Sequence, residues 1–403
     1  MRPTALFLNY HPYTSLSRRG RSILPTSEVN IHLVTRSHGG VPGHDHDRIA
    51  HIATFDVRNS DHVRSFCEWT LRNHPITHVL ALHEKAVLPA AELRTQFGLD
   101  GMDLETAMRF RDKVTMKQVI RDADAAPVPE FSKLDGPDDL TALNWGTGRK
   151  VIKSRVGLGA SEVHIVEDIE SARAVCSTLD LTGSTYEIEE FVAGEIYHCD
   201  AIMQNGTIRF ASVAKYIANP ASYAPGGFFG TVLLSEGELF HRITDLNAKA
   251  LSALGLQDGV THLELFHTPD DELIFCEVAG RPAGGVIPPV LEWHFGINIF
   301  EESLRLQAGL PLSFPRPNQQ RSGTCGFVAF YPDGRPNGHV GTEEQAALGV
   351  LEHSRHSSAG DGSGGVRHST DFQDSYVIEA PDQEALMQRI EEVKRIYTGS
   401  RSN

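Results

Sequence analysis

Apolar residues fall in short runs between polar or helical stretches over the first hundred residues. The runs TALFLN, NIHLVT and THVLAL, at 4–9, 30–35 and 77–82, have the length of buried strands. The stretch PAAELRTQFG, at 89–98, has the spacing of a helix. Buried strands that alternate with helices predict a parallel sheet in an α/β unit, so we expect an N-terminal α/β domain over residues 1–102.

The pattern changes after residue 102. Asp103 and Asp112 each precede a helical stretch whose first turn they can cap, and A-P-V-P ends the second helix. Strands with Gly-rich turns dominate from residue 149 onward. A shift to Pro, Ser and Gly begins at residue 311, followed by one more strand and an amphipathic helix. We therefore expect a second domain over 103–310 and a C-terminal α+β subdomain over 311–403.

The segment THLELFHTPDDELIFCEV predicts a hairpin that carries two acids in otherwise apolar strands. A turn centred on P-D-D-E sets Phe266 opposite Phe275. Two steps further out, it sets Glu264 opposite Glu277. Carboxylates on directly opposed positions repel by roughly 3 kcal/mol at about 5 Å and an effective dielectric near 20. One or two Mg²⁺ ions would offset this repulsion, and protein-bound Mg²⁺ usually takes phosphate oxygens as well. The alternative is a solvated sheet face.

Residues just beyond the second acid favour a ligand site over a solvated face. If the strand continues, Arg281 lies on the same side as Glu277, where a guanidinium can stabilise developing negative charge. Gly284 and Gly285 follow, and they let the backbone approach a ligand closely.

Two lysines are candidates for binding phosphate. Lys153 lies at the end of a short apolar strand in RKVIKS, and the Gly-rich turn G-L-G-A-S follows at 157–161. Backbone N–H groups of such a turn can bind phosphates, although the spacing is neither a Walker A nor a Rossmann fingerprint and a plain hairpin turn is the alternative. Lys113 follows Asp112, which can cap the helix. The alternative interpretation of Lys113 is an exposed lysine on that helix with no role in binding.

Another hairpin is predicted in EIYHCDAIMQNGTIRFASV, where Asn205-Gly206 is a strong two-residue turn signal. On its first strand, His198, Asp200 and Ile202 share one face. The His and Asp could bind a polar substrate or form a satisfied pair at a sheet edge, and the sequence leaves both open.

Composition narrows the class of protein. The 403 residues carry a net charge of −15, from 37 Lys+Arg against 52 Asp+Glu, which argues against general nucleic-acid binding. No apolar run approaches the roughly 18 residues of a membrane span. Five scattered cysteines favour reduced thiols and a cytoplasmic location. The His-rich stretch HDHDRIAH (44–51) lies in a polar, loop-like region, so a metal site there is the less favoured interpretation.

Taken together and in this order, the motifs resemble the ATP-grasp superfamily, in particular its carboxylate–amine ligases such as the bacterial L-amino-acid ligases. The resemblance covers roughly residues 78–310. It includes R-D-K (111–113), V-I-K-S (151–154), E-E-F-V-A-G-E (189–195) and the acids of F-C-E-V-A-G-R-P. It implies an ATP-grasp fold, with a Rossmann-like N-terminal domain before it and a C-terminal α+β subdomain that completes the ligase.

The resemblance also implies roles for individual residues. Lys113 and Lys153 would contact the nucleotide. Glu264 and Glu277 would hold Mg²⁺, for which Mn²⁺ can substitute, and Arg281 would contact the reacting phosphate or carboxylate. Further contacts with ATP are expected from Gly157, Gly159, Ser161, Glu189, Glu190, Phe191, Val192 and, through the ribose, Glu195. Contacts with the other substrates are expected from His198, Asp200, Arg281, Gly284 and Gly285.

Two departures from the family pattern are visible. In many relatives the acid that binds the ribose sits one place later, where this chain has Ile196. Relatives also commonly carry Asn two residues after the second acid, as a further metal ligand, and this chain has Ala279 there.

The implied reaction transfers the γ-phosphoryl group of MgATP to a carboxylate, and an amine then displaces phosphate to give an amide, ADP and phosphate. Small carboxylates and amines such as amino acids are the expected substrates, with neither nucleic acid nor membrane as a partner. Family members are often dimers, so a homodimer is compatible with the resemblance. Segments 157–161 and 218–230 are expected to close over the site. The alternatives are an enzyme of the purine-ligase or carboxylase type, and a non-catalytic ATP-binding sensor.

Overall fold

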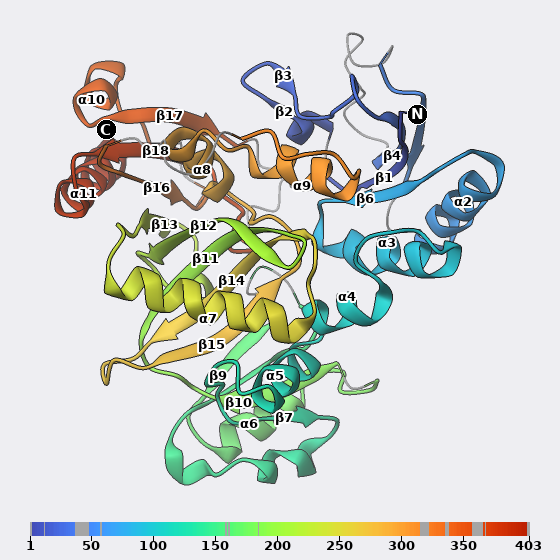
Figure 1. The fold of residues 1–403 in the computed structure, drawn as a ribbon. Coiled ribbons are helices and arrows are strands. Elements are labelled where there is room, and N and C mark those ends of the chain that lie inside the picture. Colours follow the sequence, from blue (N-terminus) through green and yellow to red (C-terminus); the bar gives the residue numbers. More distant parts are fainter. Residues whose placement is uncertain are drawn as a thin grey trace.

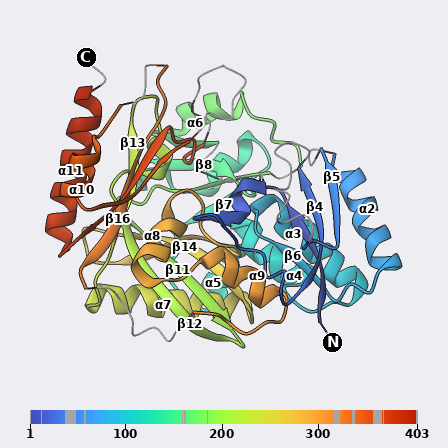
Figure 2. The ribbon, with the colours of Figure 1, turned by 90° about the horizontal axis from the view of Figure 1, so that it is seen from above.

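The described residues form three larger sheets and a two-stranded ribbon near the N-terminus (Figure 1). The computed structural model describes residues 2–11, 13–36, 48–56, 59–157, 159, 162–183, 185–314, 322–334, 338–356, 366 and 368–400. Seen from above, the N-terminal strands and the C-terminal helix lie on opposite sides of the molecule (Figure 2).

The N-terminal sheet has the strand order β5-β4-β1-β6, and all its neighbours are parallel, as the sequence predicted. Both faces are buried, which explains why its strands are continuous apolar runs. The strands are β1 (Thr4–Asn9), β4 (Asn30–Arg36), β5 (His51–Phe55) and β6 (His78–Ala81). The neighbouring elements are η1 (Tyr13–Leu16), β2 (Ser17–Arg18), β3 (Arg21–Ser22), α2 (Ser60–Asn73) and α3 (Glu84–Phe97).

Two short helices connect this domain to the second sheet. They are α4 (Leu104–Arg111) and α5 (Lys113–Asp122), and Asp103 and Asp112 cap them as predicted. The second sheet is antiparallel, with the order β7-β10-β8-β9. Its strands are β7 (Phe131–Leu134), β8 (Lys150–Ser154), β9 (Val163–Val166) and β10 (Tyr186–Glu190). The intervening helices are η2 (Pro137–Ala142), η3 (Trp145–Thr147) and α6 (Ile169–Cys176).

The largest sheet has eight strands in the order β15-β14-β11-β12-β13-β16-β18-β17. The strands from the predicted C-terminal subdomain therefore continue the sheet that begins in the central part of the chain. The strands are β11 (Glu195–Gln204), β12 (Thr207–Tyr216), β13 (Phe228–Leu233), β14 (Gly259–His267), β15 (Leu273–Ala279), β16 (Thr324–Phe330), β17 (Val350–Arg355) and β18 (Asp374–Ala380).

Helices cover both faces of this sheet. They are η4 (Pro220–Ser222), α7 (Glu238–Leu254), α8 (Ile287–Phe295), α9 (Ile299–Gln307), α10 (Thr342–Ala347) and α11 (Gln383–Ser400). The helix α7 packs on one face of β11, β12 and β14, while α8 packs on β16 and α9 on β14 and β11 from the opposite face (Figure 1). Among the described residues, no helix combines the length and apolarity needed to cross a membrane.

Candidate active site

The two acids of the β14–β15 hairpin are cross-strand partners. Glu264 lies opposite Glu277, as the sequence predicted. The neighbouring prediction was wrong, because Phe275 lies opposite Leu265 and not opposite Phe266. A β-bulge between Glu264 and Leu265 accounts for this difference, since it leaves Cys276 as an extra residue on β15 and shifts the register by one. Bulges re-aim side chains and are common beside active sites.

Lys113 lies beside the second acid. Its Nζ atom is 3.1 Å from Glu277 Oε2 and donates a hydrogen bond of 3.3 Å to the carbonyl of Gly157. Burial raises the pKa of Glu277, but the ammonium groups of Lys113 and Lys153 outweigh it and lower this pKa to about 2. Lys113 starts α5, whose cap Asp112 forms an ion pair with Arg155. The start of α5 therefore holds Lys113 at the site. The alternative, an exposed lysine on a helix, is wrong because Lys113 is buried.

Lys153 belongs to a buried group of four charged side chains. Its Nζ atom is 2.5 Å from Glu189 Oε1. Lys117, which is completely buried, lies 2.9 Å from the Glu187 carboxylate and forms a second ion pair with Glu189. Burial lowers the pKa of Lys153, but the nearby carboxylates outweigh it and raise this pKa well above its usual value. Sequence reasoning missed Lys117 and Glu187, although Lys117 lies four residues after Lys113 on the same helix face.

Arg281 lines the cavity and also contacts the start of α3. Its guanidinium forms an ion pair with Glu84, which begins α3 and is 6% exposed. The same carboxylate pairs with Arg111, whose guanidinium also donates to the carbonyl of Val156 at 2.6 Å. Glu84 thus joins the N-terminal domain to two arginines of the central part of the chain. No motif in the sequence indicated this acid.

His198 and Asp200 do not line the cavity, contrary to the expectation that they contact a substrate. Both are buried behind His262, a residue that the sequence interpretation missed. Asp200 accepts hydrogen bonds from His198 Nδ1 at 2.8 Å and from His262 Nδ1 at 2.9 Å. The ring of Tyr216 lies over His198 with a centroid distance of 4.8 Å. The histidine and the aspartate therefore orient His262 rather than touching the cavity themselves.

His262 presents its other ring nitrogen to the carboxylate pair. Its Nε2 atom is 3.5 Å from Glu264 Oε1, and the Tyr216 hydroxyl donates to the same oxygen at 2.7 Å. Burial lowers the pKa of His262, but Asp200 and Glu264 outweigh it and raise this pKa to about 10. His262 is also the cross-strand partner of Ala279. An imidazolium thus lies opposite the position where the family pattern has asparagine.

Glu195, the candidate for binding the ribose, is placed away from the cavity. Its carboxylate pairs with Lys215 at 2.5 Å and accepts from Tyr197 at 3.3 Å. The neighbouring Ile196 lines the cavity instead, because successive residues of a strand point to opposite faces. The expectation for Glu195 is therefore not supported by this geometry.

The remaining predicted residues come together around one cavity of about 270 Å³. Its lining includes Lys113, Lys153, Gly157, Gly159, Glu189, Glu190, Phe191, Val192, Glu264, Glu277, Arg281, Gly284 and Gly285. Ser161 lies outside the described residues. Val151, Ile165 and Val278 contribute apolar walls. Phe229, Phe327 and Phe372, whose rings contact one another, also line the cavity.

Both segments predicted to cover the site contribute to its lining. Gly159, with a φ of 63°, accepts a hydrogen bond of 3.2 Å at its carbonyl from the N–H of Ser369. Asn219, Pro220 and Ala221 line the cavity from the 218–230 segment. Two loops that are distant in the sequence therefore line the same cavity.

The carboxylate pair fits a divalent cation. Glu264 and Glu277 both line the cavity, and their side chains are 20% and 35% exposed. Within the described part of the chain, Glu264 Oε2 and Glu277 Oε1 have no hydrogen-bond or ion-pair partner. Hard cations such as Mg²⁺ prefer such oxygens. Ala279 offers no third side-chain ligand, so water or phosphate oxygens would complete the coordination.

Comparison with known proteins agrees with this fold. A family model described as an ATP-grasp domain matches residues 145–289. The L-arginine-specific L-amino acid ligase of Bacillus subtilis is 29% identical over 338 residues, which cover 80% of each chain. The L-amino acid ligase of Bacillus licheniformis superposes with a TM-score of 0.76 at 16% identity, over 98% of this chain and 97% of that one. Carboxyaminoimidazole ribonucleotide synthase of Aspergillus clavatus, solved with ATP, gives 0.71 at 13% identity over 99% of each chain.

Proposed function

We propose that this chain, an ATP-grasp enzyme similar to the amino-acid ligases, uses ATP to join the carboxylate of one amino acid to the amine of another. The observation that carries the proposal is the Glu264–Glu277 pair, which opens into a cavity that Lys113, Lys153 and Arg281 also line. Two acids beside three cations suit a metal–polyphosphate ligand. The aromatic group of Phe229, Phe327 and Phe372 in the same lining is proposed to contact an amino-acid side chain.

ATP is proposed to lie with its adenine against the strand end at 189–192 and the apolar walls beside it. Its phosphates would then reach Lys113 and Lys153, whose ammonium groups are held in place by ion pairs with Glu277 and Glu189. The N–H groups of Gly157 and Gly159 are proposed as further donors for phosphate oxygens. Lys153 stays charged at neutral pH, because its carboxylate neighbours raise its pKa.

Glu264 and Glu277 are the residues that would hold Mg²⁺, which when bound neutralises charge on the polyphosphate and orients it. The low pKa of Glu277 keeps this carboxylate ionised at neutral pH, as a metal ligand must be. The Tyr216 hydroxyl and His262 fix the orientation of the other carboxylate.

The reaction is proposed to proceed in two displacements. A carboxylate oxygen of the first amino acid attacks the γ-phosphorus of ATP, the bond to the β–γ bridging oxygen breaks, and ADP leaves. The amine of the second amino acid then attacks the carbonyl carbon, the bond from this carbon to the phosphate oxygen breaks, and phosphate leaves as the nitrogen loses a proton. Arg281 and the His262 imidazolium are the cations placed to attract the carboxylate and the transferring group.

Water must be kept away from the acyl phosphate, because hydrolysis would waste ATP. The Gly-rich loop 157–161, of which Gly157 and Gly159 are described, and the segment 218–230 are proposed to close over the cavity. Their support is the contact between Gly159 and Ser369 and the position of Asn219–Ala221 in the lining.

One observation favours a second candidate, a non-catalytic ATP-binding sensor. Ala279 removes a ligand that the family pattern supplies, and His262 places a positive charge opposite it. The two functions differ in turnover: a ligase releases phosphate only with a carboxylate and an amine present, whereas a sensor binds ATP without turnover.

The test is phosphate release from MgATP with pools of amino acids, starting with basic ones because one relative is L-arginine-specific. The expected result is release that requires amino acids, with a matching amount of ADP and amide product. Glu277→Gln should lower the rate at least about 100-fold. Glu272→Gln, at the exposed tip of the same hairpin, should keep wild-type activity. No release with any pool, but tight ATP binding, would contradict the ligase and support the sensor.

A further inference from the structure

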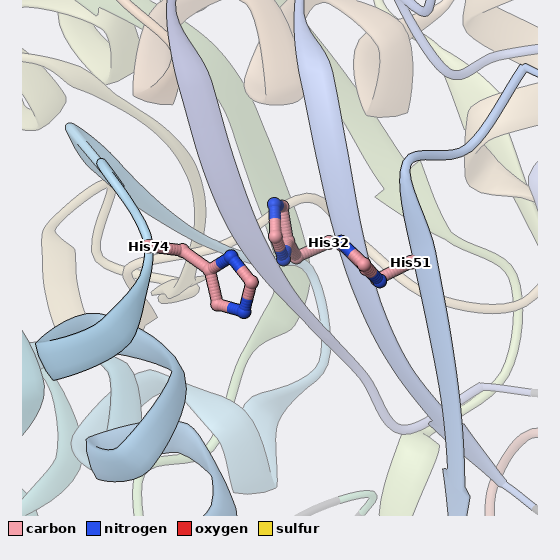
Figure 3. Close-up of side chains that lie close together, drawn as sticks. All are labelled: His32, His51 and His74. Atoms are coloured by element: carbon pink, nitrogen blue, oxygen red, sulfur yellow. The ribbon is translucent and has the colours of Figure 1, made fainter.

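Three histidines from separate elements converge in the N-terminal domain, outside the cavity described above (Figure 3). His32 lies on β4, His51 begins β5 and His74 directly follows α2. Their ring centroids are 4.5 Å apart for His32 and His51, 4.7 Å for His32 and His74, and 5.1 Å for His51 and His74. Each ring can offer a nitrogen such that all three nitrogens lie within 4.8 Å of one another.

His51 is the last residue of the His-rich stretch HDHDRIAH, which sequence analysis placed in a loop-like region. That placement is wrong for His51, which is the first residue of a strand. Residues 44–47 of the stretch lie outside the described residues. Among the described residues, His51 lies beside two histidines from elsewhere in the chain.

The fold explains why the three side chains meet. His32 and His51 are direct neighbours in the parallel β4–β5 pair. His74 is the C-cap of α2, and its backbone N–H donates to the carbonyl of Thr70 at 3.0 Å, which fixes its position. His32 and His51 lie near the amino ends of their strands, and His74 shortly precedes β6. Amino ends of parallel strands share one edge of the sheet, so the cluster forms at that edge.

The three rings are poor partners for one another without a bound ion. A neutral imidazole has one donor and one acceptor nitrogen, and buried polar groups are normally hydrogen-bonded. Among the described residues, the three rings contact one another and make no side-chain hydrogen bond. His32 is only 7% exposed, whereas His51 is exposed and His74 is half-buried. The cluster therefore has one inner ring and a side open to water.

We propose that His32, His51 and His74 bind a divalent transition metal of the zinc class, with water as a fourth ligand. Imidazole nitrogen suits Zn²⁺, Co²⁺, Ni²⁺ and Cu²⁺, and no carboxylate of the described residues belongs to the cluster, which disfavours Mg²⁺ and Ca²⁺. Nitrogens on one tetrahedral Zn²⁺ are about 3.4 Å apart at Zn–N distances of about 2.05 Å. Rotation about the side-chain torsions can close the remaining gap from 4.8 Å.

The metal has a stabilising role and not a catalytic one. The cluster lies at the amino ends of the parallel strands, whereas Glu84 lines the cavity just beyond the carboxyl end of β6. The bound ion would link the end of α2 to β4 and to the edge strand β5. An ion that binds only the folded domain raises its apparent stability.

The test uses the full-length chain without a polyhistidine tag, freed of metal by a chelator and titrated with Zn²⁺ in a calorimeter. Wild type is expected to bind one tight Zn²⁺, and the His51→Gln/His74→Gln double variant should lose at least about 100-fold in affinity. His62→Gln, an exposed histidine of α2, is the matched control and should bind as wild type does. His32 is left unchanged because its buried ring contributes to packing.

Trp69 provides a second, local measurement. Its ring lies edge-on to His74 at 5.7 Å and is 53% exposed. Addition of Cu²⁺ should quench its fluorescence, a change that Trp69→Phe removes and His62→Gln retains. Zn²⁺ should raise the melting temperature of wild type but not that of the double variant. The proposal is overturned if wild type binds no Zn²⁺ tightly, or if the double variant binds it as wild type does.

Discussion

Glu264 and Glu277 lie opposite each other across the β14–β15 hairpin, and a β-bulge between Glu264 and Leu265 sets their register. The bulge leaves Cys276 without a cross-strand partner, so that Glu277 rather than its neighbour opposes Glu264. Two carboxylates are thereby brought to one face beside Lys113. The arrangement makes this hairpin the centre of the proposed site.

Restoring an amide at position 279 should strengthen metal binding. Ala279 lies at the end of β15, opposite His262, and the side chain of Ala279→Asn would supply the carbonyl oxygen that the family pattern contains. The Mg²⁺ concentration that gives half-maximal phosphate release should fall roughly three- to tenfold, because one more oxygen ligand is supplied. Ala279→Ser, with a shorter side chain, is the control for any change in packing. An unchanged or higher Mg²⁺ requirement in Ala279→Asn would show that position 279 does not face the metal.

Removing the charge of Glu84 should destabilise the contact between the N-terminal domain and the rest of the chain. Glu84 is buried between Arg111 and Arg281, and its loss leaves two guanidinium groups without their carboxylate. Breaking a buried ion pair typically destabilises by about 3–5 kcal/mol. Glu84→Gln should therefore lower the urea midpoint clearly, and it should raise the KM for the carboxylate substrate because Arg281 is no longer oriented.

Glu92→Gln on the same helix is the matched control. Its side chain is 41% exposed and lies 3.4 Å from Arg64, and exposed pairs contribute about 1 kcal/mol or less. Equal urea midpoints for the two variants would contradict the structural role assigned to Glu84.

The turn at 157–159 should determine how well the reaction is protected from water. Gly159 has a φ of 63°, which a β-branched residue rarely adopts, so Gly159→Val should displace the turn. The ratio of phosphate released to amide formed should rise above one. Gly183→Val is the control, since Gly183 also has a positive φ but has no other atoms within 4 Å of an added Cβ and lies outside the cavity lining. A ratio of one in both variants would exclude a lid role for the turn.

Acid should weaken the fold partly through His83. The Nδ1 atom of this residue accepts the N–H of Lys85 at 3.1 Å and caps α3, so the ring must be neutral there. Burial, together with His11 and Arg281, lowers the pKa of His83 to about 3. At pH values between the ordinary pKa of histidine and this lower pKa, the unfolded chain binds a proton that the folded chain does not. The free energy of unfolding should therefore fall as the pH falls, by up to about 1.4 kcal/mol per pH unit.

His83→Asn separates the cap from the titration, because asparagine is a good N-cap without a titrating ring. Urea midpoints measured from about pH 7 to pH 5 should decline less steeply in His83→Asn than in wild type. His62→Asn, on the exposed surface of α2, should follow the wild-type slope. Parallel slopes for all three proteins would show that His83 does not contribute.

Local patterns predicted most of the fold and the main acids of the site. The apolar runs, the caps Asp103 and Asp112, and the Asn205-Gly206 turn, with φ values of 52° and 67°, all depend on short-range physics that a sequence displays. The Glu264–Glu277 register was also correct, yet the bulge beside it was not foreseen. An extra residue in a strand leaves no clear mark on the alternation of apolar and polar positions.

The missed residues depend on contacts that sequence spacing does not reveal. Glu84, at the start of α3, meets Arg281 across a separation of 197 residues. Lys117 and Glu187 form a buried ion pair between a helix and a strand. His262 could have been found, because it shares a strand face with Glu264 two residues later. The alternation of side chains along a strand also predicted the face of β11 on which Asp200 lies. It could not show that Tyr216 and His262 separate Asp200 from the cavity.

The central claim is that a carboxylate oxygen attacks the γ-phosphorus of ATP. It is tested most directly with an amino acid whose carboxylate carries ¹⁸O, in a reaction with MgATP and a second amino acid. We expect the released phosphate to contain one ¹⁸O atom for each amide bond formed, with ADP as the nucleotide product, and Glu277→Gln to show no such transfer. Unlabelled phosphate, or ¹⁸O in AMP together with released pyrophosphate, would contradict the acyl-phosphate route.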